Sequence, residues 1–186
     1  MRRRLPREFY ARDTRVVAQE LCGKYLVRGR RVGRIVEVEA YHGPDDQASH
    51  ARRGPTPRAA IMFGPAGIAY VYQIYGMFFC LNLVTMHDGF PGAVLVRALE
   101  PVAGLGETAL DGPGKLCRAL DIDRSLNGRD VVREAGLWIE DRGDAAPRLR
   151  ATARVNVDYA GEWAARPWRW VVEGARVSKP RWGLAS

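Results

Sequence analysis

Two carboxylates and a phenol alternate along one short segment of the chain. In the segment 36–41, Val-Glu-Val-Glu-Ala-Tyr, the side chains of Glu37, Glu39 and Tyr41 occupy every second position. On a β-strand these three side chains point to the same face, with alternate residues about 6.6–6.8 Å apart. Such a face could activate a water molecule and stack a flat ring. Because charged side chains are mostly exposed, a solvated face of an edge strand remains the alternative interpretation.

Aromatic side chains are concentrated in the segment 69–80, which holds five of them within twelve residues. The enrichment in β-formers predicts a β-hairpin over 68–84 with Tyr75-Gly76-Met77 at its tip. By alternation Tyr70 and Tyr72 share a face, as cross-strand packing partners do. Tyr75 and Met77 at an exposed tip are harder to explain by packing. An apolar wedge there could enter a stack of bases.

The remaining pattern predicts the elements that position these residues. A helix capped by Asp13 or Thr14 should end at Gly23, and the polar, basic segment after Gly43 should form a surface loop as far as Pro57. The strand at 34–41 should be half-buried, since Val36 and its alternate neighbours are apolar. Further elements are a short helix at 113–120 and strands at 94–99, near 137–139, at 153–157 and at 170–172.

Length and composition fit a single soluble domain over residues 1–186. The formal net charge of +8 favours a polyanionic partner, either nucleic acid or an anionic membrane surface. All but three of the 29 basic residues are arginines, a bias that GC-rich coding would also produce. Three scattered cysteines indicate neither a disulfide framework nor a zinc site. With no leader pattern and no long apolar run, we expect a cytoplasmic protein that does not enter a membrane.

The residues described above resemble the alkyladenine (3-methyladenine) DNA glycosylase family. The matching segments follow one another in order over almost the whole chain. They are IVEVEAYHGP (35–44) with His50, TPR (56–58), MF (62–63), YVYQIYGM (70–77) leading to Asn82, RALEP (97–101), GPGKLC (112–117) and YAGEW (159–163). Two departures are visible: Phe78 stands where the family often has tyrosine, and the long N-terminal extension of animal members is absent.

The resemblance implies an α+β fold and a set of catalytic roles. The fold would be a single compact domain with a curved, largely antiparallel β-sheet, flanking helices and a protruding β-hairpin. Glu39 would be the general base, with Arg97 and the backbone carbonyl of Val155 helping to hold the nucleophilic water. Glu37 would be structural. No metal ion and no organic cofactor would be needed.

The same resemblance implies how the damaged nucleotide is held. The extruded base would lie between Tyr41 on one side and His50 with Tyr72 on the other. Tyr75, together with Met77, would fill the gap left in the duplex. The side chain of Asn82 would clash with the exocyclic amino group of normal guanine at the floor of the pocket. Chemistry on a base requires the base outside the stack, so these roles are physically consistent.

The implied function is base excision repair by a monofunctional DNA glycosylase. It would act, as a monomer associated with the nucleoid if bacterial, on double-stranded DNA that contains alkylated or deaminated purines. The implied substrates are 3-methyladenine, hypoxanthine, ethenoadenine and 7-methylguanine. Strand cleavage usually requires an amine that forms a Schiff base with the sugar, and no lysine lies in the Glu39 or hairpin segments. Lys115, after a Gly-Pro-Gly turn, is instead interpreted as a phosphate contact.

Two other classes of function are compatible with a basic chain that carries exposed tyrosines. A non-catalytic binder of damaged or bent DNA would use Tyr75 as a wedge but would not need Glu39 and Arg97. A single-stranded RNA-binding module would use the tyrosines as stacking platforms and would prefer unpaired strands. A glycosylase would prefer duplex DNA.

Overall fold

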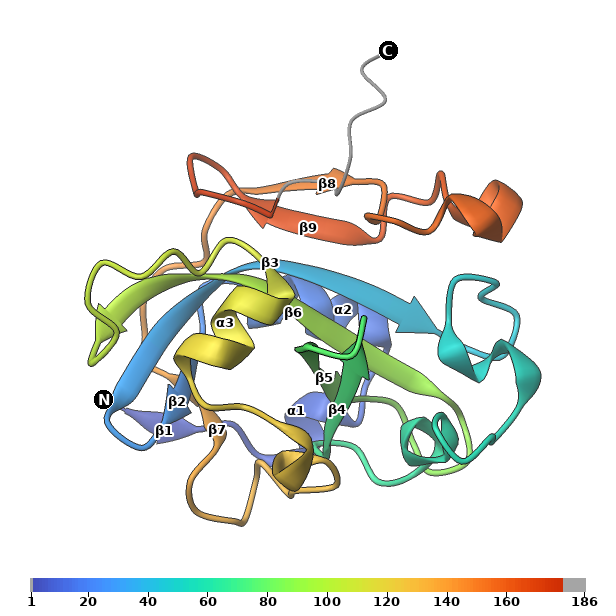
Figure 1. The fold of residues 1–186 in the computed structure, drawn as a ribbon, viewed down its shortest axis with the longest axis horizontal. Helices are drawn as coiled ribbons and strands as arrows, with labels where there is room; N and C mark the ends of the chain where they lie inside the picture. Colours follow the sequence, from blue (N-terminus) through green and yellow to red (C-terminus); the bar gives the residue numbers. More distant parts are fainter. Residues whose placement is uncertain (1, 179–186) are drawn as a thin grey trace.

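A curved antiparallel sheet organises the part of the chain that the computed structural model describes, residues 2–178 (Figure 1). Short helices flank the sheet, so the fold is α+β, as predicted. The elements in chain order are β1 (Arg3–Arg4), α1 (Arg7–Tyr10), α2 (Thr14–Leu21), β2 (Tyr25–Arg28), β3 (Arg31–His42), the 3-10 helices η1 (His50–Arg53) and η2 (Ala60–Phe63), β4 (Ala69–Ile74), β5 (Phe78–Val84), β6 (Gly92–Ala103), α3 (Pro113–Ala119), η3 (Arg124–Leu126), β7 (Trp138–Asp141), β8 (Leu149–Thr152), η4 (Asp158–Trp163) and β9 (Arg169–Val172).

The two longest strands, β3 and β6, form the centre of the sheet. They pair along most of their length, and the strand order runs β1-β7-β2-β3-β6-β5-β4. The other edge of β3 is shared by two short strands: β2 pairs with its first residues and β9 with the stretch around Val38. Figure 1 shows β8 and β9 above this central pair, with α3 in front of the sheet. Segments distant in sequence therefore meet at the second half of β3.

Strand β3 is buried on both faces between Ile35 and Ala40. The prediction of a half-buried strand was therefore wrong. The apolar face of β3 packs, together with Val17 and Leu21 of α2, in the hydrophobic core. Burying Val or Leu side chains stabilises the fold by roughly 1.5–3 kcal/mol each. The polar face is covered instead by later segments of the chain, which supply hydrogen-bond donors to the two glutamates.

The pairing of β3 with β6 is irregular near Glu37. The register shifts between Ile35 and Glu37 and again between Glu37 and Val38, so Arg97 is left out of the regular series of pairs. Such irregularities bend a strand and re-aim side chains, and they are over-represented beside active sites. Here the irregularity lies where Arg97 of β6 meets the carboxylates of β3.

The predicted β-hairpin is confirmed, and its tip has an unusual backbone. Strands β4 and β5 pair without a register shift, and the backbone N–H of Met77 donates to the carbonyl of Ile74 at 3.2 Å. The two residues between Ile74 and Met77 both have positive φ, 51° at Tyr75 and 68° at Gly76. A type I′ turn requires this geometry, which glycine adopts freely and a tyrosine rarely does. A strained non-glycine residue at an exposed tip is a hint of function.

Most of the other predicted elements are confirmed, with one error. Asp13 caps α2 by accepting a 2.8 Å hydrogen bond from the backbone N–H of Arg15, and α3, β6, β7 and β9 lie where the sequence indicated. No strand forms at 153–157. The strand is β8, which ends at Thr152, and Asn156 has a φ of 59°, which a strand does not accept. The predicted loop after Gly43 contains η1.

Candidate active site

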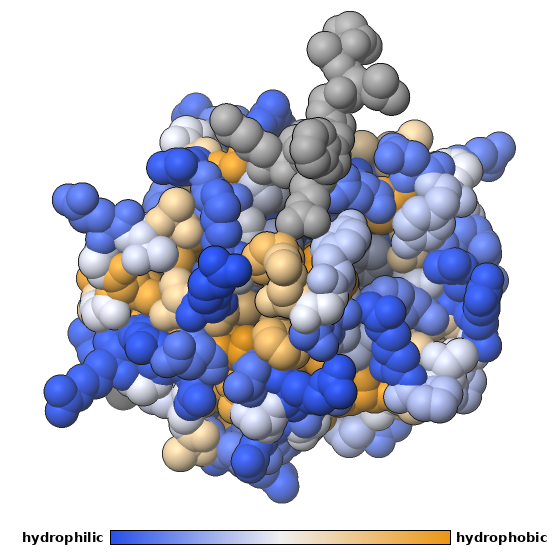
Figure 2. Space-filling model, viewed as in Figure 1, coloured by the Kyte–Doolittle hydropathy of each residue, from blue (hydrophilic) through white to orange (hydrophobic). Residues whose placement is uncertain are grey.

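A cavity of about 630 Å³ opens between the β4–β5 hairpin, α3 and the segment 155–159. Binding sites for small ligands typically measure about 300–1,000 Å³, so this cavity has room for an extruded nucleotide. Figure 2 shows hydrophobic residues near the centre of this face, with hydrophilic residues around them. An apolar hollow with a polar rim is suited to a nucleotide whose flat base lies inside while its charged phosphates stay at the rim.

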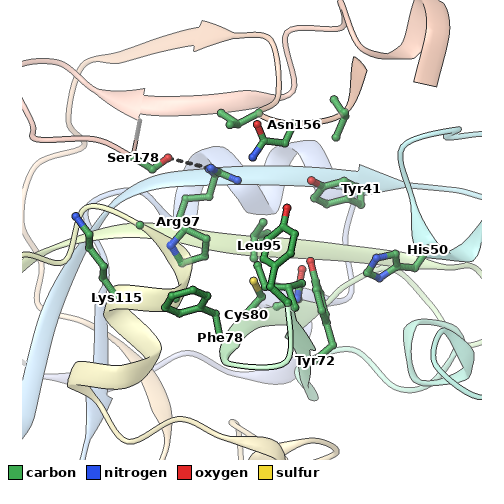
Figure 3. A pocket seen from close by; sticks show the side chains of 18 of the residues that line it. Tyr41, His50, Tyr72, Phe78, Cys80, Leu95, Arg97, Lys115, Asn156 and Ser178 are labelled. Carbon is green, nitrogen blue, oxygen red and sulfur yellow. Dashed lines mark hydrogen bonds between the residues drawn. The ribbon is translucent and has the colours of Figure 1, made fainter. Parts of the chain in front are cut away.

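Aromatic rings form the two walls of one end of the cavity. Tyr41, His50 and Tyr72 all line it, and Figure 3 shows Tyr41 on one side with Tyr72 and His50 on the other. The His50 and Tyr72 ring centroids are 4.7 Å apart in an edge-to-face arrangement. Burial raises the pKa of both Tyr41 and Tyr72 well above 10, so both phenols are neutral. The structure thus brings together the three residues predicted to enclose a base.

The imidazole of His50 is held in its neutral form. Its Nδ1 lies 2.9 Å from the Tyr70 hydroxyl, and burial, helped by Arg58 and Arg52, lowers its pKa to about 4. A histidine in the unfolded chain titrates near pH 6.5, so acid protonates the unfolded state first. The neutral imidazole therefore costs no stability above pH 6.5. Stability is lost as the pH falls from 6.5 towards 4.

Replacing His50 with glutamine should flatten this acid dependence. We expect the free energy of unfolding, measured with urea, to fall by about 3 kcal/mol less between pH 7 and pH 4 than in the unmodified protein. His87 is exposed, so His87→Gln should keep the original pH dependence and serves as the control. An unchanged pH dependence in His50→Gln would mean that other groups cause the acid destabilisation.

Glu39 lies directly behind the aromatic walls, with no exposed surface. Its Oε1 accepts a hydrogen bond from the backbone N–H of Val155 at 2.7 Å. Its Oε2 accepts from the Tyr41 hydroxyl at 2.8 Å and from Nη1 of Arg97 at 3.2 Å. These three donors satisfy both oxygens of the carboxylate. Arg97, predicted to help hold the water, therefore lies beside Glu39, and Val155 contacts the carboxylate through its backbone N–H rather than through the predicted carbonyl.

The three partners of Glu39 separate it from the open cavity. Tyr41, Arg97 and Val155 all line the cavity, whereas Glu39 itself is behind them. Nη1 of Arg97 carries two N–H groups, and Glu39 is its one acceptor among residues 2–178. One N–H is therefore left for a water molecule or a substrate atom beside the carboxylate.

A buried network that the sequence did not indicate surrounds Glu37. Its carboxylate accepts hydrogen bonds from Nε of Arg97 at 3.2 Å and from Nε of Arg169 at 2.6 Å. Ser178 adds two more, from its backbone N–H at 2.6 Å and its hydroxyl at 2.7 Å. With Glu39 included, the negative charges of two carboxylates are balanced by the positive charges of Arg97 and Arg169. Although burial acts in the opposite direction, Glu39 and Glu37 raise the pKa of Arg97 above its usual value.

Asn82 and the hairpin tip lie where the sequence predicted. Asn82 is buried, lines the cavity and donates from Nδ2 to the carbonyl of Tyr70 at 3.2 Å, which fixes the orientation of its amide. At the tip, 69% of Tyr75 and 65% of Met77 are exposed. Both are large hydrophobic side chains, and both are more than half exposed. Tyr75 also lines the cavity, so the hairpin tip and the pocket are adjacent.

The comparison with known proteins decides the family. The sequence profile of the family described as Methylpurine-DNA glycosylase (MPG) matches residues 8–176. A protein of Anaeromyxobacter sp. (strain Fw109-5) is 60% identical over 176 residues, which cover 92% of this chain and 90% of the relative. A protein of Methanocella arvoryzae is 51% identical over 181 residues, covering 89% and 90%. Both are named as 3-methyladenine DNA glycosylases. This chain belongs to the methylpurine-DNA glycosylase family.

Membership of the methylpurine-DNA glycosylase family confirms the predicted resemblance and makes the chain a DNA N-glycosylase, an enzyme of DNA repair. It decides against both the RNA-binding module and the non-catalytic DNA binder. In residues 2–178 no helix has the length and apolar character needed to cross a membrane. The same residues contain no cluster of three His, Cys, Asp or Glu side chains placed to hold a metal ion.

In this methylpurine-DNA glycosylase a buried ion pair braces the segment that covers Glu39. Arg154 contacts Asp46 through two hydrogen bonds of 2.6 and 2.8 Å, and both side chains are fully buried. Arg154 also donates to the carbonyl of Ala40 at 2.9 Å, and its guanidinium lies 4.9 Å from the Tyr41 ring centroid. The residue after Arg154 is Val155. The pair thus joins the loop after β3 to the segment that contains Val155.

Basic side chains line the cavity or stack on rings in its wall. Lys115, predicted to contact phosphate, lies on the wall and pairs with Asp111 at 2.7 Å. The carboxylate of Asp111 also accepts from Nε of Arg176 at 2.6 Å. In the basic segment, the guanidinium of Arg58 lies 4.7 Å from the Tyr72 ring centroid. Arg58 thus stacks on an aromatic wall of the cavity.

Proposed function

We propose that this DNA glycosylase releases alkylated and deaminated purines from duplex DNA by hydrolysis, with Glu39 as the general base. The substrates would be 3-methyladenine, hypoxanthine, ethenoadenine and 7-methylguanine, and the product an intact strand with an abasic site, which starts base excision repair. The enzyme would act as a monomer on nucleoid DNA. The observation that carries this proposal is the carboxylate of Glu39, fixed by three donors behind an aromatic slot.

The chemistry follows from the position of these groups. As the glycosidic bond breaks, positive charge develops on the sugar, and an ionised carboxylate stabilises that charge while it orients or deprotonates water. The remaining N–H of Arg97 Nη1 can hold the water on its other side. A non-catalytic binder has no use for a carboxylate desolvated at this position, because burying a charge is costly unless it is paired.

Lesion selectivity would come from the slot. Alkylation at N3 or N7 places a positive charge on the purine, and the neutral rings of Tyr41 and Tyr72 would attract it by about 0.5–2 kcal/mol. Hypoxanthine and ethenoadenine carry no charge, so shape and hydrogen bonds to His50 would select them. Asn82 would exclude normal guanine by a clash with its exocyclic amino group. Its amide is held in one orientation by Tyr70, which supports this role.

Water rather than an amine would be the nucleophile. Among the described residues 2–178, Lys115 is the one lysine that lines the cavity, and its ammonium is held by Asp111. An ammonium group in an ion pair is not a nucleophile, because Schiff-base chemistry needs the free amine. Reduction with borohydride during turnover should therefore trap no covalent enzyme–DNA adduct.

A panel of duplex oligonucleotides, each with one lesion, tests the proposal. We expect release of free base from the duplexes that contain 3-methyladenine, hypoxanthine, ethenoadenine or 7-methylguanine, and much slower release of normal adenine and guanine. The same lesions in single strands should be poorer substrates. Tight duplex binding with no base release from any lesion would overturn the proposed function.

The hairpin tip provides a separate prediction. Tyr75→Ala should weaken binding to lesion-containing duplex by roughly 10- to 100-fold, because an aromatic side chain stacked on a base contributes about 1–3 kcal/mol. The hydrolysis rate of a base already captured should change much less. Tyr75→Phe retains the ring and is the matched control. If the hydrolysis step falls while binding is unchanged, Tyr75 is not the wedge.

A further inference from the structure

The hydroxyl of Ser178 has a full set of hydrogen bonds inside the protein. It donates to Oε1 of Glu37 at 2.7 Å, and it accepts from Nε and Nη2 of Arg97 at 3.1 and 3.0 Å. A serine hydroxyl has one donor and two acceptor positions, so none is left for solvent. Ser178 is itself buried. Figure 3 shows it beside Arg97 at the wall of the cavity, with the hydrogen bond between them.

This arrangement matters because two carboxylates share one guanidinium. Arg97 contacts Glu37 and Glu39 at the same distance, 3.2 Å. Planar guanidinium groups favour two parallel bonds to one carboxylate, and such a fork–fork pair with Glu37 would draw Nη1 away from Glu39. The Ser178 oxygen occupies the edge of Arg97 formed by Nε and Nη2. Only Nη1 is then directed at Glu39.

Ser178 and Arg169 also supply Glu37 with hydrogen-bond donors other than Arg97. The backbone N–H of Ser178 donates to Oε2 of Glu37 at 2.6 Å, and Arg169 donates to Oε1 at the same distance. A carboxylate satisfied by these donors competes less for the guanidinium. Both effects act in the same direction. They leave the catalytic glutamate as the preferred partner of Nη1.

We propose that Ser178 is a positioning residue for the glycosylase reaction, which holds the Arg97 guanidinium so that Nη1 faces Glu39 and the attacking water. This inference rests on the proposed function of Glu39 and Arg97. Ser178 does not touch the reacting atoms; it acts through Arg97. The segment after β9 thereby contributes to the active site, although it is distant in sequence from Glu39 and Arg97.

Two substitutions at this position separate a hydrogen-bonding role from a packing role. Ser178→Ala removes the hydroxyl, and Ser178→Cys replaces it with a group of similar shape that forms only weak hydrogen bonds. The single-turnover rate of hypoxanthine release should fall in both variants, on the order of 10- to 100-fold, as for a misplaced catalytic group. Binding to a duplex with a non-hydrolysable 2′-fluoro analogue should change less than about twofold.

The controls distinguish the possible failures. Ser125 is exposed, so Ser125→Ala should keep the original rate. NMR of the Arg97 Nε–H, which needs no substrate, should show a protected signal whose chemical shift changes in both Ser178 variants. A rate like that of the unmodified protein in Ser178→Cys would overturn the proposal and indicate packing alone. If the unmodified protein releases no damaged purine, the proposed function fails, while the NMR signal still tests the placement of Arg97.

Discussion

Glu39→Gln should reduce the single-turnover release of hypoxanthine by about 10²–10⁴-fold, the range that a general base contributes. Glutamine has the same shape, and its carbonyl oxygen can still accept a hydrogen bond from the backbone N–H of Val155. It has no negative charge to stabilise the developing cation and no basic oxygen to accept a proton from water. The pocket stays intact, so binding of the lesion-containing duplex should persist.

The design of this measurement separates the loss of chemistry from the loss of structure. Rates come from quenched single-turnover assays, and affinities from titration of a duplex that carries the non-hydrolysable analogue. Glu100→Gln, on β6 in the same sheet, removes a partly exposed carboxylate that pairs with Arg34 and should change neither quantity. Release within tenfold of the original rate in Glu39→Gln would remove Glu39 from the mechanism.

Local patterns were sufficient for the hairpin and for the alternation of side chains along β3, but not for the segment 153–157, which they predicted as a strand. The hairpin over β4 and β5 was predictable because alternation and the Tyr75-Gly76 tip are encoded within a few residues. The placement of Glu39 on the same strand face as Tyr41 was predictable for the same reason. The family motifs add roles to these positions.

Long-range contacts account for what the sequence did not indicate. Glutamates at alternate positions on β3 were equally typical of a solvated edge, and only the cover provided by Val155 and Ser178 makes them buried. Apart from Tyr41, the partners of Glu39 and Glu37 lie more than 50 positions away in sequence. Arg154 stands in a segment that alternation predicts as a strand. Nothing near Asp46 in sequence marks it as the partner of Arg154.

The ion pair of Asp46 and Arg154 should contribute strongly to the stability of the fold. Asp46 and Arg154 are both fully buried, so removing one partner leaves an uncompensated charge in the interior. Asp46→Ala and Arg154→Ala should each lower the free energy of unfolding by about 3–5 kcal/mol, measured by urea denaturation. The exposed pair of Arg129 and Glu134 is the control, and the corresponding alanine variants should each cost less than about 1 kcal/mol.

The double variant shows whether the pair acts as a unit. If the main cost of each single change is the unpaired charge, Asp46→Ala with Arg154→Ala should be less destabilising than the two single effects added together, with a coupling of about 0.5–3 kcal/mol. Because Arg154 precedes Val155, the double variant should still release hypoxanthine more slowly than the unmodified protein at a temperature where it is folded. Additive stability losses would mean that Asp46 and Arg154 are held by separate contacts. A normal rate in the folded double variant would mean that Val155 keeps its place without the brace.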